Sequence, residues 1–378
     1  MKKIFTLVFV FQLVILPGFS QIVEGNFMFG GLNRTYAVYL PASFQPDETL
    51  PLVVALHGLT QNGASMMSFS GFNAIADTGN FVVVYPDGIS NAWNVGFSGG
   101  STADDVGFLV ALVDSLHQQY NIDNNRVYAT GFSNGGFMSY KLACEVPATF
   151  AAIAPVSGTM TEASLANCQP TMAMPVLHIH GTSDFVVSYT GNYGNVSADA
   201  VLAVWTGFNN CPSIPVVEDL PDLVSDGSTV ERYTWAPCDD GSEVVLLKVL
   251  NGGHTWPGSV GVTGIGITNR DIVASSEIWN FVKRFTKGEP TGIPSFNLPA
   301  FDFYPNPNDG KQITIASGKP MGNLSVSIIE ISGRLVFSKQ IQLLSSTFLL
   351  NLPDMKPGYY LINLSGNEFA ETQKLVVY

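Results

Sequence analysis

Short runs of consecutive apolar, often β-branched residues recur along the first three quarters of the chain. Such runs are typical of strands buried on both faces of a sheet, and they lie at 52–56, 81–85, 127–130, 151–156, 176–179 and 244–249. Between them the apolar positions follow a helical period, at 64–78, 103–120, 135–145, 198–209 and 271–285. This alternation predicts a mostly parallel sheet covered by helices, with 35–40 as an antiparallel edge strand.

The pattern changes after residue 287. Residues 288–299 contain three Pro and two Gly without any periodicity, which predicts a linker. Residues 300–378 hold short strand-like runs separated by turns such as Asn-Asp-Gly at 308–310, as in a small all-β sandwich. We therefore expect an α/β domain over 21–287 and a β-sandwich over 300–378.

The first twenty residues have the layout of a secretory signal peptide. The chain begins Met-Lys-Lys, continues with a largely apolar stretch over 4–17, and has small residues before Gln21. The alternative is a transmembrane anchor, but about fourteen apolar residues are short for a bilayer, which needs roughly twenty. No later segment is long and apolar enough to span. We expect a secreted protein that loses residues 1–20.

Charge is distributed unevenly between the two expected domains. The 378 residues are 46% hydrophobic and 12% charged, with a net charge of −13. Residues 21–287 hold 9 basic and 23 acidic side chains, whereas 288–378 hold 6 and 7. Excess negative charge opposes binding to a phosphate backbone, so nucleic-acid partners are not expected.

Four cysteines, all in the α/β part, suit an oxidising compartment. Four cysteines allow three pairings, and pairing of sequence neighbours would give Cys144–Cys168 and Cys211–Cys238, each closing a short loop. A zinc site is the alternative, but no Cys-x-x-Cys spacing occurs and no His lies near these positions. No metal is therefore expected.

Residues 131–135 form a Gly-x-Ser-x-Gly motif centred on Ser133. In a nucleophile elbow a strand precedes this motif and a helix follows it, so that a strained turn exposes the serine hydroxyl at the carboxyl edge of the sheet. Ser133 lies between the predicted strand 127–130 and the predicted helix 135–145. A second match, centred on Ser98, lies in a Gly- and Ser-rich loop with no strand before it. Ser133 is therefore the candidate nucleophile.

A serine nucleophile needs a base, and the base needs an acid that orients it. After a strand–serine–helix elbow, the acid comes first along the chain and the His second. Asp184 and His254 each follow a predicted strand and are the candidate acid and base. His178 and His180 share one strand face, and the favoured interpretation is that they are packed in the core or lie at its rim. His117 lies in a predicted helix and is interpreted as a surface residue.

The oxyanion formed during acyl transfer needs N–H donors that are already in place. The amide of Asn134, directly after the nucleophile, is one candidate donor. The amide of Leu59, in the loop after the first buried strand, is the other, with a purely structural turn as the alternative. The candidate substrate-binding residues near this site are His57, Trp93, Phe97 and Trp256. Their aromatic rings are suited either to stacking on a sugar or phenolic ring or to forming a plain wall.

Six stretches in this order give the α/β part a specific resemblance. They are LHGLTQN (56–62), YPDG (85–88), DDVGF (104–108), GFSNGG (131–136), GTSD (181–184) and GHTWPG (253–258). Together they resemble secreted esterases of the polyhydroxybutyrate depolymerase and feruloyl esterase family. The resemblance implies an α/β-hydrolase fold with the triad Ser133, Asp184 and His254, disulfides such as those above, and no cofactor.

The same resemblance implies a serine esterase acting on an ester-bearing polymer or oligomer. Feruloyl or acetyl esters of plant cell-wall polysaccharide are the favoured substrates, and polyhydroxybutyrate or another short-chain polyester is the alternative. A non-catalytic adhesin built on a hydrolase fold is a further possibility, against which the intact triad argues.

The C-terminal part resembles the sorting domain of the type IX secretion system. The stretches that carry this resemblance are FYPNP (303–307), IEISGR (329–334), KPGYYL (356–361) and KLVV (374–377). The resemblance implies a partner, the type IX machinery, and delivery to the cell surface or beyond. A carbohydrate- or polymer-binding module is the alternative, since both are small β-sandwiches.

Overall fold

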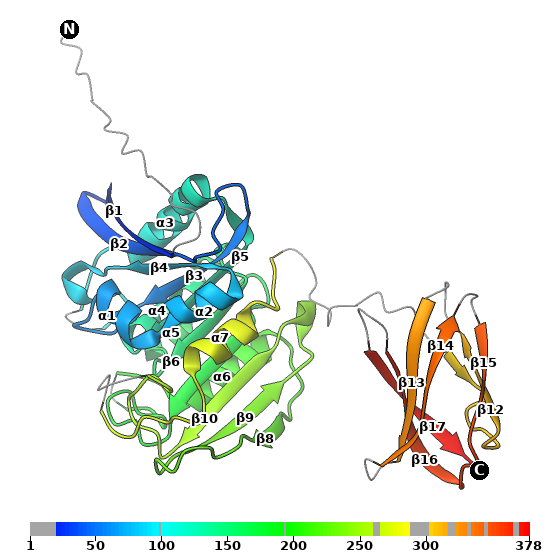
Figure 1. Cartoon of the computed structure of the whole chain (residues 1–378). Helices are drawn as coiled ribbons and strands as arrows, with labels where there is room; N and C mark the ends of the chain where they lie inside the picture. Colours follow the sequence, from blue (N-terminus) through cyan, green and yellow to red (C-terminus); the bar gives the residue numbers. More distant parts are fainter. Residues whose placement is uncertain are drawn as a thin grey trace. The chain divides into compact units, whose positions relative to one another are not determined.

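A ten-stranded mixed sheet forms the framework of the N-terminal part in the computed structural model (Figure 1). In the order in which they lie side by side, the strands are β1 (Gln21–Phe29), β2 (Leu32–Leu40), β4 (Val82–Pro86), β3 (Leu50–Leu56), β5 (Ile122–Phe132), β6 (Ala152–Val156), β7 (Val176–Gly181), β10 (Val244–Leu250), β9 (Thr229–Trp235) and β8 (Val216–Asp219). The six central strands from β4 to β10 run parallel, and an antiparallel pair flanks them on each side.

The structure describes residues 20–97, 100–192, 194–259, 265–287, 302–316, 322–330, 334–343, 347–365 and 370–378. The chain divides into two units, 1–292 and 293–378. The expected signal peptide, apart from Ser20, and the expected linker 288–299 lie outside the described residues, as does Ser98. Within the described part, no helix has the length and apolar character needed to cross a membrane.

The central strands are apolar throughout because both of their faces are covered. Along β3, Leu52, Val54 and Leu56 point into one hydrophobic core, whereas Val53 and Ala55 point into the other. Successive side chains of a strand alternate between faces, so every position of a strand that lies between two cores favours an apolar residue. The continuous apolar runs in the sequence reflect this double burial.

Two groups of helices cover the two faces of the sheet. The first core takes side chains from α3 (Asp105–Tyr120), α4 (Asn134–Glu145) and α6 (Ala198–Phe208). The second core takes side chains from α1 (Gly63–Ser70), α2 (Phe72–Gly79) and α7 (Ala274–Val282). The short helix α5 (Glu162–Asn167) lies in the connection between β6 and β7. The predicted α/β-hydrolase fold, a mostly parallel sheet covered by helices, is confirmed.

Two predicted elements differ from the observed ones, and one observed element was not predicted. The single helix expected at 64–78 is two helices, because Gly71 adopts φ +68° and ends α1 in a left-handed turn. The strand expected at the edge, 35–40, is the inner strand β2, because β1 pairs along its outer side. The hairpin of β8 and β9 at the opposite edge was not anticipated, since β8 is exposed along its whole length.

The C-terminal unit is all-β, as expected. One antiparallel sheet consists of β11 (Asp302–Tyr304), β12 (Gln312–Ala316) and β15 (Thr347–Asn351). The other consists of β14 (Leu335–Leu343), β13 (Gly322–Glu330), β16 (Gly358–Ser365) and β17 (Ala370–Val377). Ile313 and Leu350 from the first sheet share one core with Val326 and Ile362 from the second. The unit is therefore a small β-sandwich.

Candidate active site

Ser133 occupies the sharp turn between β5 and α4, at the carboxyl end of a central parallel strand. Its backbone angles are φ +53° and ψ −117°, a conformation that L-residues rarely adopt. Non-glycine residues persist in such strained conformations only where the surrounding structure holds them, most often at functional sites. The turn leaves Ser133 partly exposed, whereas Phe132 and Asn134 on either side are buried.

The two glycines of the motif are required by close backbone packing. A Cβ on Gly131 would collide with the backbone of Gly135, and a Cβ on Gly135 would collide with the carbonyl of Leu56 at the end of β3. The Gly-x-Ser-x-Gly spacing therefore lets α4 begin directly against the ends of β5 and β3. This packing sets the position of the Ser133 turn.

Asp184 and His254 follow the carboxyl ends of β7 and β10, which are neighbouring parallel strands. The Nδ1 atom of His254 lies 2.7 Å from Oδ2 of Asp184. The other carboxylate oxygen, Oδ1, accepts hydrogen bonds from the amides of Val186 at 2.9 Å and Val187 at 2.8 Å. Since a carboxylate can only accept, Nδ1 of His254 carries the proton, and Nε2 is left as the basic nitrogen.

The imidazole of His254 lies against the strand that carries the nucleophile. Its ring centroid is 4.8 Å from that of Phe132, the residue before Ser133. A second contact joins the His254 loop to the residue after β6, from the Ser157 hydroxyl to the carbonyl of Thr255 at 3.4 Å. The sheet thus brings Ser133, Asp184 and His254, far apart in sequence, to one edge.

Burial and hydrogen bonding act in opposite directions on the Asp184 carboxyl. Burial alone would raise its pKa, but the contacts with His180 and His254 outweigh burial and hold the pKa at about 2. Asp184 is therefore ionised at neutral pH and presents a fixed negative charge to His254.

The loop after β3 is held by the side chain of His57. Nδ1 of His57 donates to the carbonyl of Gly58 at 2.7 Å, and Nε2 accepts from the amide of Gly88 at 2.9 Å. Burial lowers the pKa of His57, which agrees with this neutral tautomer. Within the described part of the chain, the amide of Leu59 has no hydrogen-bond partner. The loop therefore offers a free N–H group.

Asn134 connects the nucleophile turn to a neighbouring loop. Its side-chain oxygen accepts from the amide of Trp93 at 2.7 Å. Its own amide belongs to the first turn of α4, where backbone N–H groups have no partner within the helix. The amides of Asn134 and Leu59 thus remain the candidates for an oxyanion site.

Two of the candidate substrate-binding aromatics, Trp93 and Trp256, are buried, which fits a plain wall better than stacking on substrate. Trp256 is 0% exposed and packs edge-on against Phe69 and Phe72 at 5.9 Å each. Trp93 is 1% exposed, and its indole N–H donates to the carbonyl of His57. Both residues lie in predicted loops, so the sequence did not indicate that their side chains are buried.

The remaining His and aromatic candidates divide in the same way. His57 is fully buried and so supports its loop without facing substrate. Phe97 is only partly buried and packs against Phe137 at 4.9 Å, so it remains a candidate for substrate contact. His178 and His180 are packed in the core, as expected. His117 is partly buried rather than on the surface, and its ring bonds to a backbone carbonyl.

Three exposed apolar side chains belong to, or directly adjoin, residues of the candidate site. Phe185 directly follows Asp184 and is 67% exposed, and Ile265, whose backbone bonds to that of His254, is 51% exposed. Leu59 in the candidate oxyanion loop is 54% exposed. Beside Leu59 a groove of about 770 Å³ is lined by Phe29, Leu32 and residues 100–104. We call Leu59, Phe185 and Ile265 the apolar rim. The only sign of this rim in the sequence was an apolar residue beside a candidate catalytic residue.

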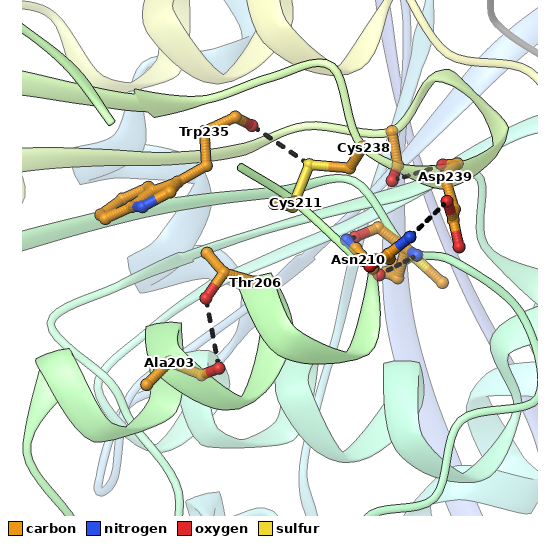
Figure 2. The surroundings of a disulfide bond; sticks show 10 residues. Ala203, Thr206, Asn210, Cys211, Trp235, Cys238 and Asp239 are labelled. Atoms are coloured by element: carbon orange, nitrogen blue, oxygen red, sulfur yellow. Dashed lines mark hydrogen bonds between the residues drawn. A yellow bond between two sulfur atoms is a disulfide. The ribbon is translucent and has the colours of Figure 1, made fainter. Parts of the chain in front are cut away.

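Both disulfides expected from neighbour pairing are present. Cys144, near the end of α4, is bonded to Cys168, which follows α5. Cys211 after α6 is bonded to Cys238 after β9 (Figure 2). Beside the second bond, the Asn210 side chain donates to Asp239. Each bond closes a loop of moderate length, and the first anchors the helix that follows Ser133.

Two family models match the chain. Residues 34–204 match the family described as Esterase PHB depolymerase, and residues 302–378 match the Secretion system C-terminal sorting domain. The second match confirms the sorting-domain resemblance and marks the chain as a protein exported by the type IX secretion system.

Three relatives illustrate the similarity. The bifunctional acetylxylan esterase/xylanase XynS20E of Neocallimastix patriciarum is 30% identical over 263 residues, which are 69% of this chain and 34% of the relative. Feruloyl esterase C of Emericella nidulans is 30% identical over 228 residues, which are 59% of this chain and 76% of the relative. Poly(3-hydroxyalkanoate) depolymerase C of Paucimonas lemoignei is 39% identical over 115 residues, which are 29% of this chain and 28% of the relative.

The chain thus spans about a third of the length of the acetylxylan esterase/xylanase but three quarters of the feruloyl esterase. The family model, the named relatives and the observed fold all indicate the same esterase family. The chain belongs to the Esterase PHB depolymerase family and is a carboxylic ester hydrolase joined to a secretion-system sorting domain.

Proposed function

We propose that this protein is a secreted serine esterase in which Ser133 is the nucleophile, His254 the general base and Asp184 the acid that orients it. The observation that carries the proposal is the 2.7 Å contact between Asp184 and His254 beside the strained Ser133 turn. It supports the tautomer in which Nε2 of His254 can take a proton.

In the proposed reaction, the Ser133 oxygen attacks the ester carbonyl while His254 Nε2 takes the hydroxyl proton. The tetrahedral oxyanion would be stabilised by the amides of Leu59 and Asn134. The carbon–oxygen bond to the alcohol then breaks, and His254 returns the proton to the departing oxygen. A water molecule, deprotonated by the same nitrogen, cleaves the acyl-enzyme and restores Ser133.

Feruloyl or acetyl esters of plant cell-wall polysaccharide are the proposed substrates. The exposed Leu59, Phe185 and Ile265 offer an apolar rim for an acyl group, and the groove beside Leu59 has room for part of a polymer. Relatives named acetylxylan esterase and feruloyl esterase support this substrate class. A short-chain polyester is the second candidate, supported by the match to the polyhydroxyalkanoate depolymerase.

Hydrolysis of a model ester tests the proposed triad, and product release from natural polymers tests the proposed substrates. Residues 21–378 should hydrolyse p-nitrophenyl acetate, and Ser133→Ala should abolish this activity. Release of ferulate, acetate and 3-hydroxybutyrate from their natural polymers then ranks the substrates. Predominant release of 3-hydroxybutyrate would replace the polysaccharide assignment by the polyester one. An inactive wild-type protein would instead support a non-catalytic adhesin.

We propose further that residues 21–287 form the catalytic domain and that residues 300–378 serve in export. Deleting residues 301–378 should then leave an active esterase in the periplasm. Normal secretion of the truncated protein, combined with weaker binding to polysaccharide or polyester, would identify the C-terminal unit as a binding module.

A further inference from the structure

Three buried side chains that the proposed reaction does not use form a line of hydrogen bonds ending at Asp184. The hydroxyl of Tyr140 in α4 is 2.8 Å from Nδ1 of His178, and Nε2 of His178 is 3.0 Å from Nδ1 of His180. Nε2 of His180 is 2.8 Å from the carbonyl of Val187 and 3.4 Å from Oδ2 of Asp184. All three side chains have no exposed surface.

The acceptor at the end of this line determines the direction of every bond in it. A carbonyl oxygen only accepts, so Nε2 of His180 must carry a proton. In a neutral imidazole, Nδ1 of His180 is then an acceptor, and it takes the proton on Nε2 of His178. The same step makes Nδ1 of His178 an acceptor for the hydroxyl of Tyr140. Every donor in the line therefore points toward Asp184.

Burial favours the uncharged forms of Tyr140 and His178 that this arrangement needs. Burial, together with the neighbouring His180, lowers the pKa of His178 well below its ordinary value, and burial raises the pKa of the Tyr140 hydroxyl. Trp205 stacks on Tyr140 at 6.1 Å, and Tyr189 meets His180 edge-on at 5.7 Å. The aromatic packing leaves the rings little room to turn.

The end of the line also holds the loop that presents the carboxylate. Val187 accepts from His180 through its carbonyl and donates to Oδ1 of Asp184 through its amide. His180 is thus linked to both carboxylate oxygens, to Oδ1 through Val187 and to Oδ2 by proximity. A shift of His180 would move the acceptor that orients His254.

We propose that His180, held in one tautomer by the carbonyl of Val187 and hydrogen-bonded through His178 to Tyr140, is a positioning residue for the Asp184 carboxylate. The inference rests on the proposed function, because it assumes that Asp184 orients the catalytic base. If the line reversed, the lone pair of His180 Nε2 would face the oxygens of Val187 and Asp184, which repel it. The hydroxyl of Tyr140, which could accept in the reversed line, supplies the first donor in the favoured direction.

Removal of the Tyr140 hydroxyl is the smallest change that tests whether this line of hydrogen bonds affects catalysis. In Tyr140→Phe we expect kcat on p-nitrophenyl acetate to fall roughly 3- to 10-fold with little change in KM, the effect of one lost hydrogen bond on the transition state. Tyr128→Phe is the matched control, since that buried hydroxyl donates to the carbonyl of Phe285 at 2.8 Å, away from the line. Equal kcat values for the two variants would overturn the proposal.

Two amide variants of His180 distinguish a role in positioning the Asp184 carboxylate from a role in packing alone. A Gln side chain can place its N–H₂ group near the Nε2 position, whereas an Asn amide reaches only the Nδ1 position. We expect His180→Gln to retain several-fold more kcat than His180→Asn, with similar KM values. If Asn substitutes as well as Gln, the Nε2–H donor has no positioning role.

The tautomers themselves can be observed in the full protein. ¹⁵N-histidine NMR at pH 7 should show both His178 and His180 protonated on Nε2, and an Nδ1–H signal for His180 would contradict the derived direction. Ser133→Ala distinguishes this failure from failure of the triad. If Ser133→Ala is inactive while Tyr140→Phe and His180→Asn are fully active, only the positioning role is wrong. If Ser133→Ala is active, the proposed triad is wrong as well.

Discussion

Replacing Asp184 by Asn should place the wrong tautomer on His254. The amides of Val186 and Val187 both donate to Oδ1 of Asp184, so an Asn side chain must turn its carbonyl oxygen toward them. Its N–H₂ group then faces Nδ1 of His254, where the carboxylate oxygen lay at 2.7 Å. Since an amide nitrogen only donates, Nδ1 becomes the acceptor and the proton moves to Nε2. A protonated Nε2 cannot take the proton of Ser133.

The expected loss follows from this change of tautomer. An Asp-to-Asn exchange that preserves geometry but reverses the base lowers kcat by about 10⁴-fold in a serine triad, which corresponds to about 5.4 kcal/mol. Asn has nearly the size of Asp, so KM should change little. The Nε2–H group of His180, 3.4 Å from the same position, would face a second donor and weaken the arrangement further.

Steady-state hydrolysis of p-nitrophenyl acetate measures this loss directly. Tryptophan fluorescence provides the folding control, because all five tryptophans lie between residues 93 and 279 and report on the N-terminal unit. A folded Asp184→Asn protein with less than a tenfold loss of kcat would refute the role assigned to the carboxylate. Such a result would show that His254 keeps its working tautomer without an acceptor at Nδ1.

Other predictions concern stability, followed by the same fluorescence signal. Replacing Cys144 and Cys168 by Ser opens a loop with a sequence separation of 24 and should cost about 3.5 kcal/mol by chain entropy; no loss would contradict that model. Arg34→Met removes a buried 2.7 Å ion pair, leaves Asp105 unpaired, and should cost about 3–5 kcal/mol in urea unfolding, whereas a change below about 1 kcal/mol would mean that Asp105 finds another partner. The pKa of Asp184 is lowered, so its ionised form stabilises the fold above about pH 4, and about 2 kcal/mol should be lost as the pH falls toward 2. The free energy of unfolding of Asp184→Asn should fall less on acidification, and an equal fall would show that the loss does not come from protonation of Asp184.

The parts of the fold that could be predicted depend on local pattern. Continuous apolar runs identified the strands β3 to β7 because both of their faces are buried, and a motif placed between a strand and a helix located the turn at Ser133. Asp184 and His254 could be proposed because each follows a strand, and parallel strands end at one edge of a sheet. The outer strand β1 was missed because apolar side chains such as Ile22 and Met28 occupy some of its exposed positions, so its sequence does not alternate between apolar and polar residues although its burial does.

The parts that could not be predicted depend on contacts between distant segments. Trp256 is buried because Phe69 and Phe72, nearly two hundred residues earlier in the chain, pack against its ring. The line from Tyr140 to Asp184 joins a helix, a strand and a loop, and the sequence shows only two His residues on one strand face. Depth and partner identity are properties of the assembled fold.

Covalent labelling tests directly whether Ser133 is the nucleophile. A fluorophosphonate reacts with an activated serine, forming a phosphorus–oxygen bond and releasing fluoride, and leaves an adduct that mass spectrometry can locate. We expect one adduct per chain on the peptide containing Ser133, absent in Ser133→Ala and retained in Ser98→Ala. Full labelling of Ser133→Ala, or an adduct on another serine of the wild-type protein, would contradict it.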